Sequence, residues 1–248
     1  TAGPMTKNII DNIIVYNAIN EFDSNDSYSQ ENLDIQINDV LNFNPSAQKI
    51  GYYSNFYKND IMYKDAIDFL IEKGIEMIEI SAPKVDLSGF VKILDEDMRV
   101  DLKKYFLKYG NKDLEVNDIK SIIEYNNLDS IERSPYGQGI FKKIINDTMS
   151  KKDFLELKSR LMVEGNKFYN IPMDEYKLDA VLSVNNYHAG YAAVAHNPAL
   201  TVPMGLRDNN EPAGLTFIGK SGSEQVLYEL GYYFEFNFSG RIPPENSN

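Results

Sequence analysis

A strand–helix–strand pattern between residues 49 and 83 most constrains how this chain can fold. Lys49–Tyr53 has strand character. A helix with one apolar face follows, capped by Asn59 or Asp60 and stopped at Gly74, and residues 77–80 form a second strand. Two strands joined by a helix over so short a stretch usually pair in parallel through a right-handed crossover. The pattern therefore predicts an α/β sheet.

The segments around this unit predict further elements. Thr6 caps an amphipathic helix that runs to about Asn20, and residues 21–46 form a long polar surface connection with a short element near 35–41. Residues 84–170 are helical and could form a lid-like insertion or a wall. The helices expected in this insertion span residues 87–109, 116–125, 139–145 and 151–169.

The last seventy residues carry the clearest strand signals. The expected strands are 178–184, 200–205 and 214–219, with a polar hairpin at 207–211 between the last two. Ser221 and Glu224 form a capping box that starts a final helix. Together these signals predict an α/β fold in which a mixed sheet is flanked by helices, within one domain spanning residues 1–248.

Composition excludes several classes of function. The chain has 248 residues and a formal net charge of −12, so a nucleic-acid partner is not expected. It has no cysteine, which removes disulfides, thiolate metal sites and a cysteine nucleophile but does not fix the compartment. No apolar run approaches the roughly 18–20 residues of a membrane span. Gly51 stands alone within the first strand and no Gly-rich loop follows that strand, so the sequence has no nucleotide-binding fingerprint. The two histidines lack the spacing to acidic partners that a metal site needs, and neither a cofactor nor a metal is expected.

The candidate binding loop follows the strong strand at 178–184. Asn185, Asn186, Tyr187 and His188 lie at the carboxyl end of this strand, where α/β folds place ligand contacts. His188 is one of two histidines, and a buried structural role is the alternative for it. No G-x-S-x-G motif is present, and Ser223 at the start of the last helix is better explained as a cap.

Two sequence blocks together resemble the amidase signature family, the Ser–cis-Ser–Lys amide hydrolases. The first is T-A-G-P-M-T-K at residues 1–7, which is similar to the family's Gly-Pro-Met segment. The second runs from D-A-V-L at 179–182 through N-P-A-L-T-V-P-M-G at 197–205 and E-P-A-G-L-T-F-I-G at 211–219 to Ser223 and the final helix. Its order and spacing resemble the C-terminal end of these enzymes, above all of peptide-amidase-like members.

The resemblance implies that the catalytic residues of the family lie outside this chain. In the family, the catalytic Lys, the cis-Ser and the nucleophilic Ser all precede the Gly-Pro-Met segment, so no catalytic role falls on any residue of this chain. We expect a C-terminal portion, cut inside a longer enzyme and inactive alone. In the full-length protein, a Ser acyl-enzyme would cleave a carboxamide of a small molecule or peptide.

The residues expected to face substrate are Asn185, Asn186, Tyr187 and His188, and with them Pro4 and Met5 from the Gly-Pro segment. A sheet that lacks part of its strands would expose an edge, so self-association is also expected. Two other interpretations stay open. One is a non-catalytic binding or regulatory module built on part of the amidase fold, and the other is a hydrolase piece that works only with a separate N-terminal chain.

Overall fold

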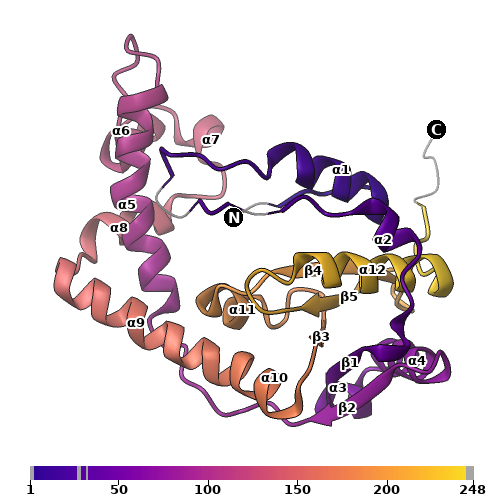
Figure 1. The fold of residues 1–248 in the computed structure, drawn as a ribbon. Helices are drawn as coiled ribbons and strands as arrows, with labels where there is room; N and C mark the ends of the chain where they lie inside the picture. The colour runs from indigo at the N-terminus through magenta and orange to yellow at the C-terminus, as the bar shows by residue number, and fades with distance from the viewer. Residues whose placement is uncertain (1–2, 27–28, 32, 244–248) are drawn as a thin grey trace. The chain divides into compact units, whose positions relative to one another are not determined.

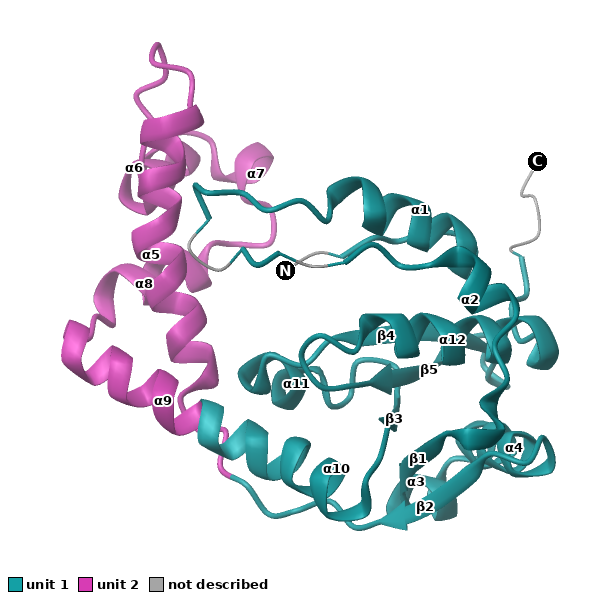
Figure 2. Ribbon diagram, in the orientation of Figure 1, with its two compact units in different colours: residues 1–85, 162–248 teal, residues 86–161 magenta. Residues whose placement is uncertain are grey.

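A computed structural model describes residues 3–26, 29–31 and 33–243 (Figure 1). The chain divides into two compact units (Figure 2). The first combines Thr1–Val85 with Met162–Asn248, and the second is Asp86–Leu161. The second unit falls inside the helical segment 84–170 expected from the sequence. None of the helices in the described part of the chain combines the length and apolarity that a bilayer span needs.

The first unit contains the sheet. Its strands are β1 (Lys49–Tyr53), β2 (Glu76–Ile80), β3 (Ala180–Val184), β4 (Ala199–Leu206) and β5 (Pro212–Ile218). Its helices are α1 (Ile9–Ile19), α2 (Ile37–Leu41), the 3₁₀ helix η1 (Pro45–Ala47), α3 (Ser54–Asn59), α4 (Ile61–Glu72), α10 (Asn170–Tyr176), α11 (Ala189–Ala195) and α12 (Glu224–Phe238).

The strands form one five-stranded sheet in the order β2-β1-β3-β5-β4. β1 pairs in parallel with both β2 and β3, whereas β5 pairs antiparallel with β3 and β4. The predicted crossover between β1 and β2 is therefore confirmed, and so is the mixed sheet with flanking helices. The hairpin between β4 and β5 is held to α4 by Arg207, which donates to Asp60 at 2.7 Å.

Successive side chains of the central strands point to opposite faces of the sheet, so the core has one layer on each face. In β3, Leu182 points into a cluster with Phe217 and Phe234, while Val181 points into a second cluster with Tyr169. All five side chains are at most 1% exposed. Full burial of an aliphatic or aromatic side chain contributes roughly 1.5–3 kcal/mol. These two layers therefore fix the register of β3, because a one-residue slip would exchange its faces.

The second unit is helical. Its helices are α5 (Phe90–Tyr109), α6 (Ile119–Asn127), α7 (Ser130–Arg133), α8 (Gly139–Asn146) and the greater part of α9 (Lys151–Phe168). A small core of Ile119, Ile123 and Ile144 joins α6 to α8. Lys143 of α8 also pairs with the largely buried Asp95 of α5 at 2.7 Å.

Two predicted helix caps are wrong. The cap of α1 is Asn8, whose side chain accepts from the Asp11 N–H at 2.8 Å, while the Thr6 hydroxyl donates to the Asn8 carbonyl. The cap position of α12 belongs to Ser223, and its hydroxyl turns back to the Lys220 carbonyl instead of serving a capping box. In both places several polar residues could cap, and the path of the preceding loop decides which one does.

Candidate functional site

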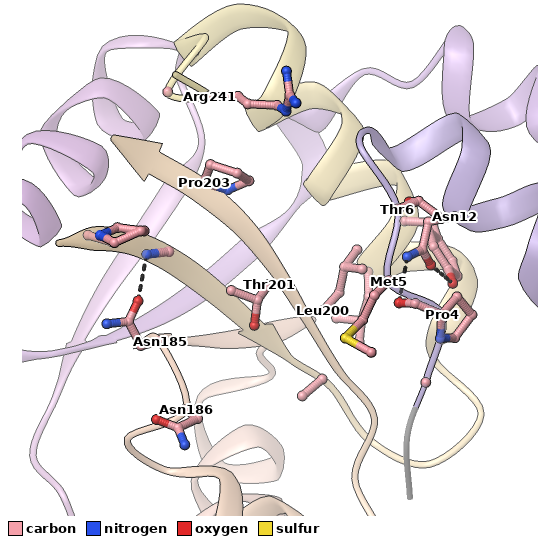
Figure 3. Close-up of a pocket in the computed structure, with 18 of the residues that line it drawn as sticks. Pro4, Met5, Thr6, Asn12, Asn185, Asn186, Leu200, Thr201, Pro203 and Arg241 are labelled. Carbon is pink, nitrogen blue, oxygen red and sulfur yellow. Dashed lines mark hydrogen bonds between the residues drawn. The ribbon is translucent and has the colours of Figure 1, made fainter. Parts of the chain in front are cut away.

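A cavity of about 1150 Å³ surrounds one margin of the sheet in the first unit (Figure 3). Seven chain segments line it: residues 3–6, the helix α1, the loop after β3, the strand β4 with Pro198 before it, the start of β5, the first half of α12 and residues 240–242. The segments are distant in sequence, and the sheet brings them together. Of the residues expected to face substrate, Pro4, Met5, Asn185 and Asn186 line this cavity.

Asn185 is held rigidly at the carboxyl end of β3. Its Oδ1 atom accepts from the Gly214 N–H at 2.7 Å, and its own N–H donates to the Gly214 carbonyl at 2.8 Å. Its backbone has a φ of 47°, a left-handed conformation that asparagine adopts more readily than most residues. The turn therefore presents Asn186 to the cavity from a fixed position.

A ladder of hydroxyl groups ties this loop to the adjacent strands. The Thr216 hydroxyl donates to the Asn185 carbonyl, and it lies 2.8 Å from the Thr201 hydroxyl. Because a hydroxyl has one proton, Thr201 must donate to Thr216. Thr201 is exposed and lines the cavity, whereas Thr216 is 5% exposed. The ladder orients the polar side of β4 toward the cavity.

The Gly-Pro segment is fixed by a second chain of hydrogen bonds. The Tyr228 hydroxyl of α12 donates to Asn12 Oδ1 at 2.7 Å, and Asn12 Nδ2 donates to the Pro4 carbonyl at 2.9 Å. Burial raises the pKa of Tyr228, which keeps this hydroxyl protonated as a donor. Pro4 is thus anchored to α1 and α12, while Met5 extends into the cavity with 90% of its surface exposed.

His188 and Tyr187 do not line the cavity. His188 is 6% exposed, and its Nδ1 atom lies 2.9 Å from the Ser183 hydroxyl. Its ring is enclosed by the aromatic rings of Tyr53, Phe56, Phe168, Tyr187 and Tyr191. Burial lowers the pKa of His188 to about 4, so the ring is neutral near pH 7.

These contacts place His188 as an anchor beneath the binding loop. Tyr187 lies at the surface with 70% of its area exposed, and its ring packs edge-on against Phe56. The loop therefore separates into two parts, since its asparagines face the cavity and its histidine faces the core.

The described residues hold a serine–histidine pair that cannot act as a nucleophile and base. Ser183 is 1% exposed and lies below the aromatic cluster, so an amide carbonyl has no path to it. Within the described ranges, none of the residues that line the cavity is a serine. Across the described residues, no three His, Cys, Asp or Glu side chains gather where they could hold a metal ion. The arrangement can bind and orient a polar ligand.

Several lining residues were missed by sequence reasoning. Asn12, Thr201, Tyr228 and Arg241 all line the cavity. Thr201 could have been found, because its hydroxyl interrupts an otherwise apolar strand. Asn12 and Tyr228 have the pattern of ordinary helix residues, and only the packing of α1 on α12 shows their role.

Comparison with known proteins shows what this chain is similar to. No family model matches the sequence. A glutamyl-tRNA(Gln) amidotransferase subunit from Staphylococcus epidermidis is 25% identical over 279 aligned positions, which cover 98% of this chain and 56% of that protein.

Solved structures agree with this placement. An amidase family protein from Bacillus anthracis superposes with a TM-score of 0.86 at 27% identity, over 99% of this chain and 50% of that one. Peptide amidase from Stenotrophomonas maltophilia shares the fold, with a TM-score of 0.84 at 22% identity, over 100% of this chain and 55% of its own.

The sheet and its matches thus define the class as an α/β amidase-type fold. More specifically, the homologues of this chain are amidase signature enzymes, which confirms the family inferred from the sequence blocks. The chain spans about half the length of the curated relatives it matches. It therefore corresponds to part of an amidase domain.

Proposed function

We propose that this chain is the scaffold and part of the substrate pocket of an amide hydrolase, and that it lacks the nucleophile. The observation that carries the proposal is the convergence of Pro4, Met5, Asn185 and Asn186 on one cavity in a chain whose homologues are amidase signature enzymes. In the whole enzyme a serine from outside this chain would attack the amide carbonyl and form an acyl-enzyme, which water then hydrolyses.

The cavity offers groups that suit an amide ligand. The Asn186 side chain carries both a donor and an acceptor, which matches the two polar atoms of a carboxamide. Leu200 and Leu227 line the same cavity and suit an apolar substituent. We assign substrate contact to Asn185, Asn186, Pro4 and Met5. Tyr187 is free to touch a larger substrate, and His188 supports the loop from below.

A single-chain chimera tests the function directly. The chain is joined to the half of the Bacillus anthracis amidase family protein that it does not match, in place of the matching half. The chimera is assayed for ammonia release from simple carboxamides and from peptide amides. We expect turnover by the chimera and none by the chain alone.

Two substitutions then locate the pocket. Asn186→Ala should lower kcat/KM of the chimera by about tenfold or more, because a bound amide loses a hydrogen-bonding partner. The matched control is Asn209→Ala in the exposed hairpin between β4 and β5, which should leave kcat/KM unchanged. A folded chimera that hydrolyses no amide would contradict the proposed function.

The partly exposed sheet also favours association. Self-association through a sheet edge is the form expected from the sequence, and β4 supplies the edge.

A further inference from the structure

The cavity carries opposite charges at its two ends. Helix α12 packs along β4, and Glu224 in the first turn of this helix lines the cavity. Arg241, just beyond the last turn of α12, lines it beside Pro203 (Figure 3). Among the lining residues within the described ranges, Glu224 and Arg241 alone are charged. A ligand that lies along β4 therefore meets an anion at one end and a cation at the other.

Two tyrosines surround the Glu224 end of the cavity. Tyr228 stands one helical turn after Glu224, so both side chains lie on the same face of α12. The Tyr16 ring of α1 meets the Tyr228 ring edge-on, with the ring centroids 5.6 Å apart. Burial raises the pKa of both tyrosines, and the nearby Glu224 carboxylate raises it further. These three lining residues, Tyr16, Glu224 and Tyr228, form what we call the α1–α12 cluster.

The α1–α12 cluster has acceptor atoms that the described part of the chain does not use. Glu224 forms no hydrogen bond or ion pair with any described residue, and the same holds for the Tyr16 hydroxyl. The Tyr228 hydroxyl donates its proton to Asn12 Oδ1, so its oxygen can still accept a hydrogen bond. An ammonium group has three N–H donors, and one carboxylate with two hydroxyl oxygens supplies three acceptors.

The surrounding charges favour a cation at this end of the cavity. The carboxylate of Asp34 also acts on Tyr16 and adds negative charge beside the cluster. Arg241, the one cation among the lining residues of the described ranges, lies at the other end. The whole chain has a net charge of −12, which attracts cationic ligands in general. A carboxylate ligand is repelled from the cluster for the same reasons.

We propose that the α1–α12 cluster binds an ammonium group of the substrate, so that the preferred substrates are amides that also carry a positively charged amine. The inference rests on the proposed function, in which Asn186 contacts the carboxamide. Leu200 and Leu227 line the same cavity and suit apolar side chains between the two polar groups. A short peptide amide with a free N-terminus presents an amine, apolar side chains and a carboxamide in this order.

A matched pair of ligands tests the ammonium site. The probes are alanyl-leucinamide, whose amine is largely protonated at pH 6.5, and its N-acetylated form, which is neutral. Binding of each probe to the full chain is measured by titration calorimetry at that pH. We expect the free amine to bind at least about tenfold more tightly than the acetylated form.

Three substitutions separate recognition of the amine from packing. Glu224→Gln removes the charge at nearly constant size and should abolish the preference for the free amine. Tyr16→Phe removes one acceptor and should reduce the preference at least about threefold, which provides a second test if Glu224→Gln does not fold. The matched control is Glu229→Gln, which loses the same charge on the same helix outside the cavity and should keep the full preference.

A purely structural role of Glu224 gives a different result. An acidic residue in the first turn stabilises a helix through its dipole. Loss of that role shifts the urea midpoint of Glu224→Gln, but it leaves the ratio of the two affinities unchanged.

Four outcomes would overturn the proposal. These are absence of binding by the free amine, equal affinities for the two probes, a preference that survives both Glu224→Gln and Tyr16→Phe, or a preference that Glu229→Gln also abolishes. The single-chain chimera, assayed with the same two probes, separates the two claims. An active chimera without preference for the free amine refutes the ammonium site and keeps the function. A preference in binding that depends on Glu224, with an inactive chimera, does the reverse.

Discussion

Acid should destabilise this protein through His188. The buried ring has a pKa of about 4, against an ordinary value of 6.5. The folded state therefore resists a proton that the unfolded state accepts below about pH 6.5. The stability contributed by the neutral ring is complete above that pH and is lost progressively as the pH falls toward 4. A difference of this size corresponds to about 3 kcal/mol in total, of which about 2 kcal/mol is lost between pH 7 and pH 5.

Burial, and not a neighbouring charge, causes this loss of stability in acid. The side chains that enclose it are Ser183 and aromatic rings, none of which is charged between pH 4 and 7. The free energy of unfolding is measured by urea titration at pH 7, 6 and 5 for the unmodified chain and for His188→Phe. The variant should be less stable at pH 7, because the Ser183 hydroxyl loses its buried partner at a cost of about 1 kcal/mol.

The test compares how steeply the free energy of unfolding falls with pH in the unmodified chain and in His188→Phe. Between pH 7 and pH 5 the unmodified chain should lose about 2 kcal/mol more than His188→Phe. His196 provides the matched control, because it is exposed and has a left-handed φ of 57° that asparagine tolerates. His196→Asn should retain the steep acid dependence. Parallel curves for the unmodified chain and His188→Phe would refute the assignment.

Three further substitutions test the packing around the cavity, each read by urea unfolding at pH 7. Tyr228→Phe should cost about 1–3 kcal/mol, because the buried Asn12 Oδ1 loses its donor, and an unchanged midpoint would contradict that bond. Asn185→Ala should cost about 2 kcal/mol, since it leaves the Gly214 N–H without a partner in a left-handed turn. Gly51→Ala should cost about 1–3 kcal/mol, because its Cβ would lie 2.7 Å from a buried leucine methyl; a neutral result would show that the side chain can move aside.

The sheet was largely predictable because its strands carry strong local signals. The strand at residues 49–53 was placed at its observed bounds, Asp60 was one of the two caps expected for α4, and the stop at Gly74 was also correct. Short apolar runs that are bounded by turn-forming residues predict buried strands. This prediction needs only the local sequence and no knowledge of the tertiary contacts. Helix α11 was missed because its alanine-rich run of seven residues has too little apolar periodicity to distinguish a helix from a loop.

The candidate site was predictable only in part. A polar loop after a buried strand signals a ligand contact, and this placed Asn185 and Asn186 at the cavity. The same rule put His188 beside them, but the chain turns into α11 at that residue and directs its ring into the aromatic cluster. The sequence alone does not show which residues of the loop face the cavity and which face the core, because adjacent residues in a turn can point in opposite directions.

The walls of the cavity are held in place by hydrogen bonds within the chain. The loop after β3 is held by the bond between Asn185 and Gly214, and the Gly-Pro segment by the bonds that link Pro4 through Asn12 to Tyr228, so the walls of the cavity are set before any ligand arrives. The hydroxyls of Thr201 and Thr6 that line the cavity are already donated within the chain. If this cavity takes part in amide hydrolysis as proposed, its walls are already in place, and a segment outside residues 1–248 has to bring the nucleophile beside them.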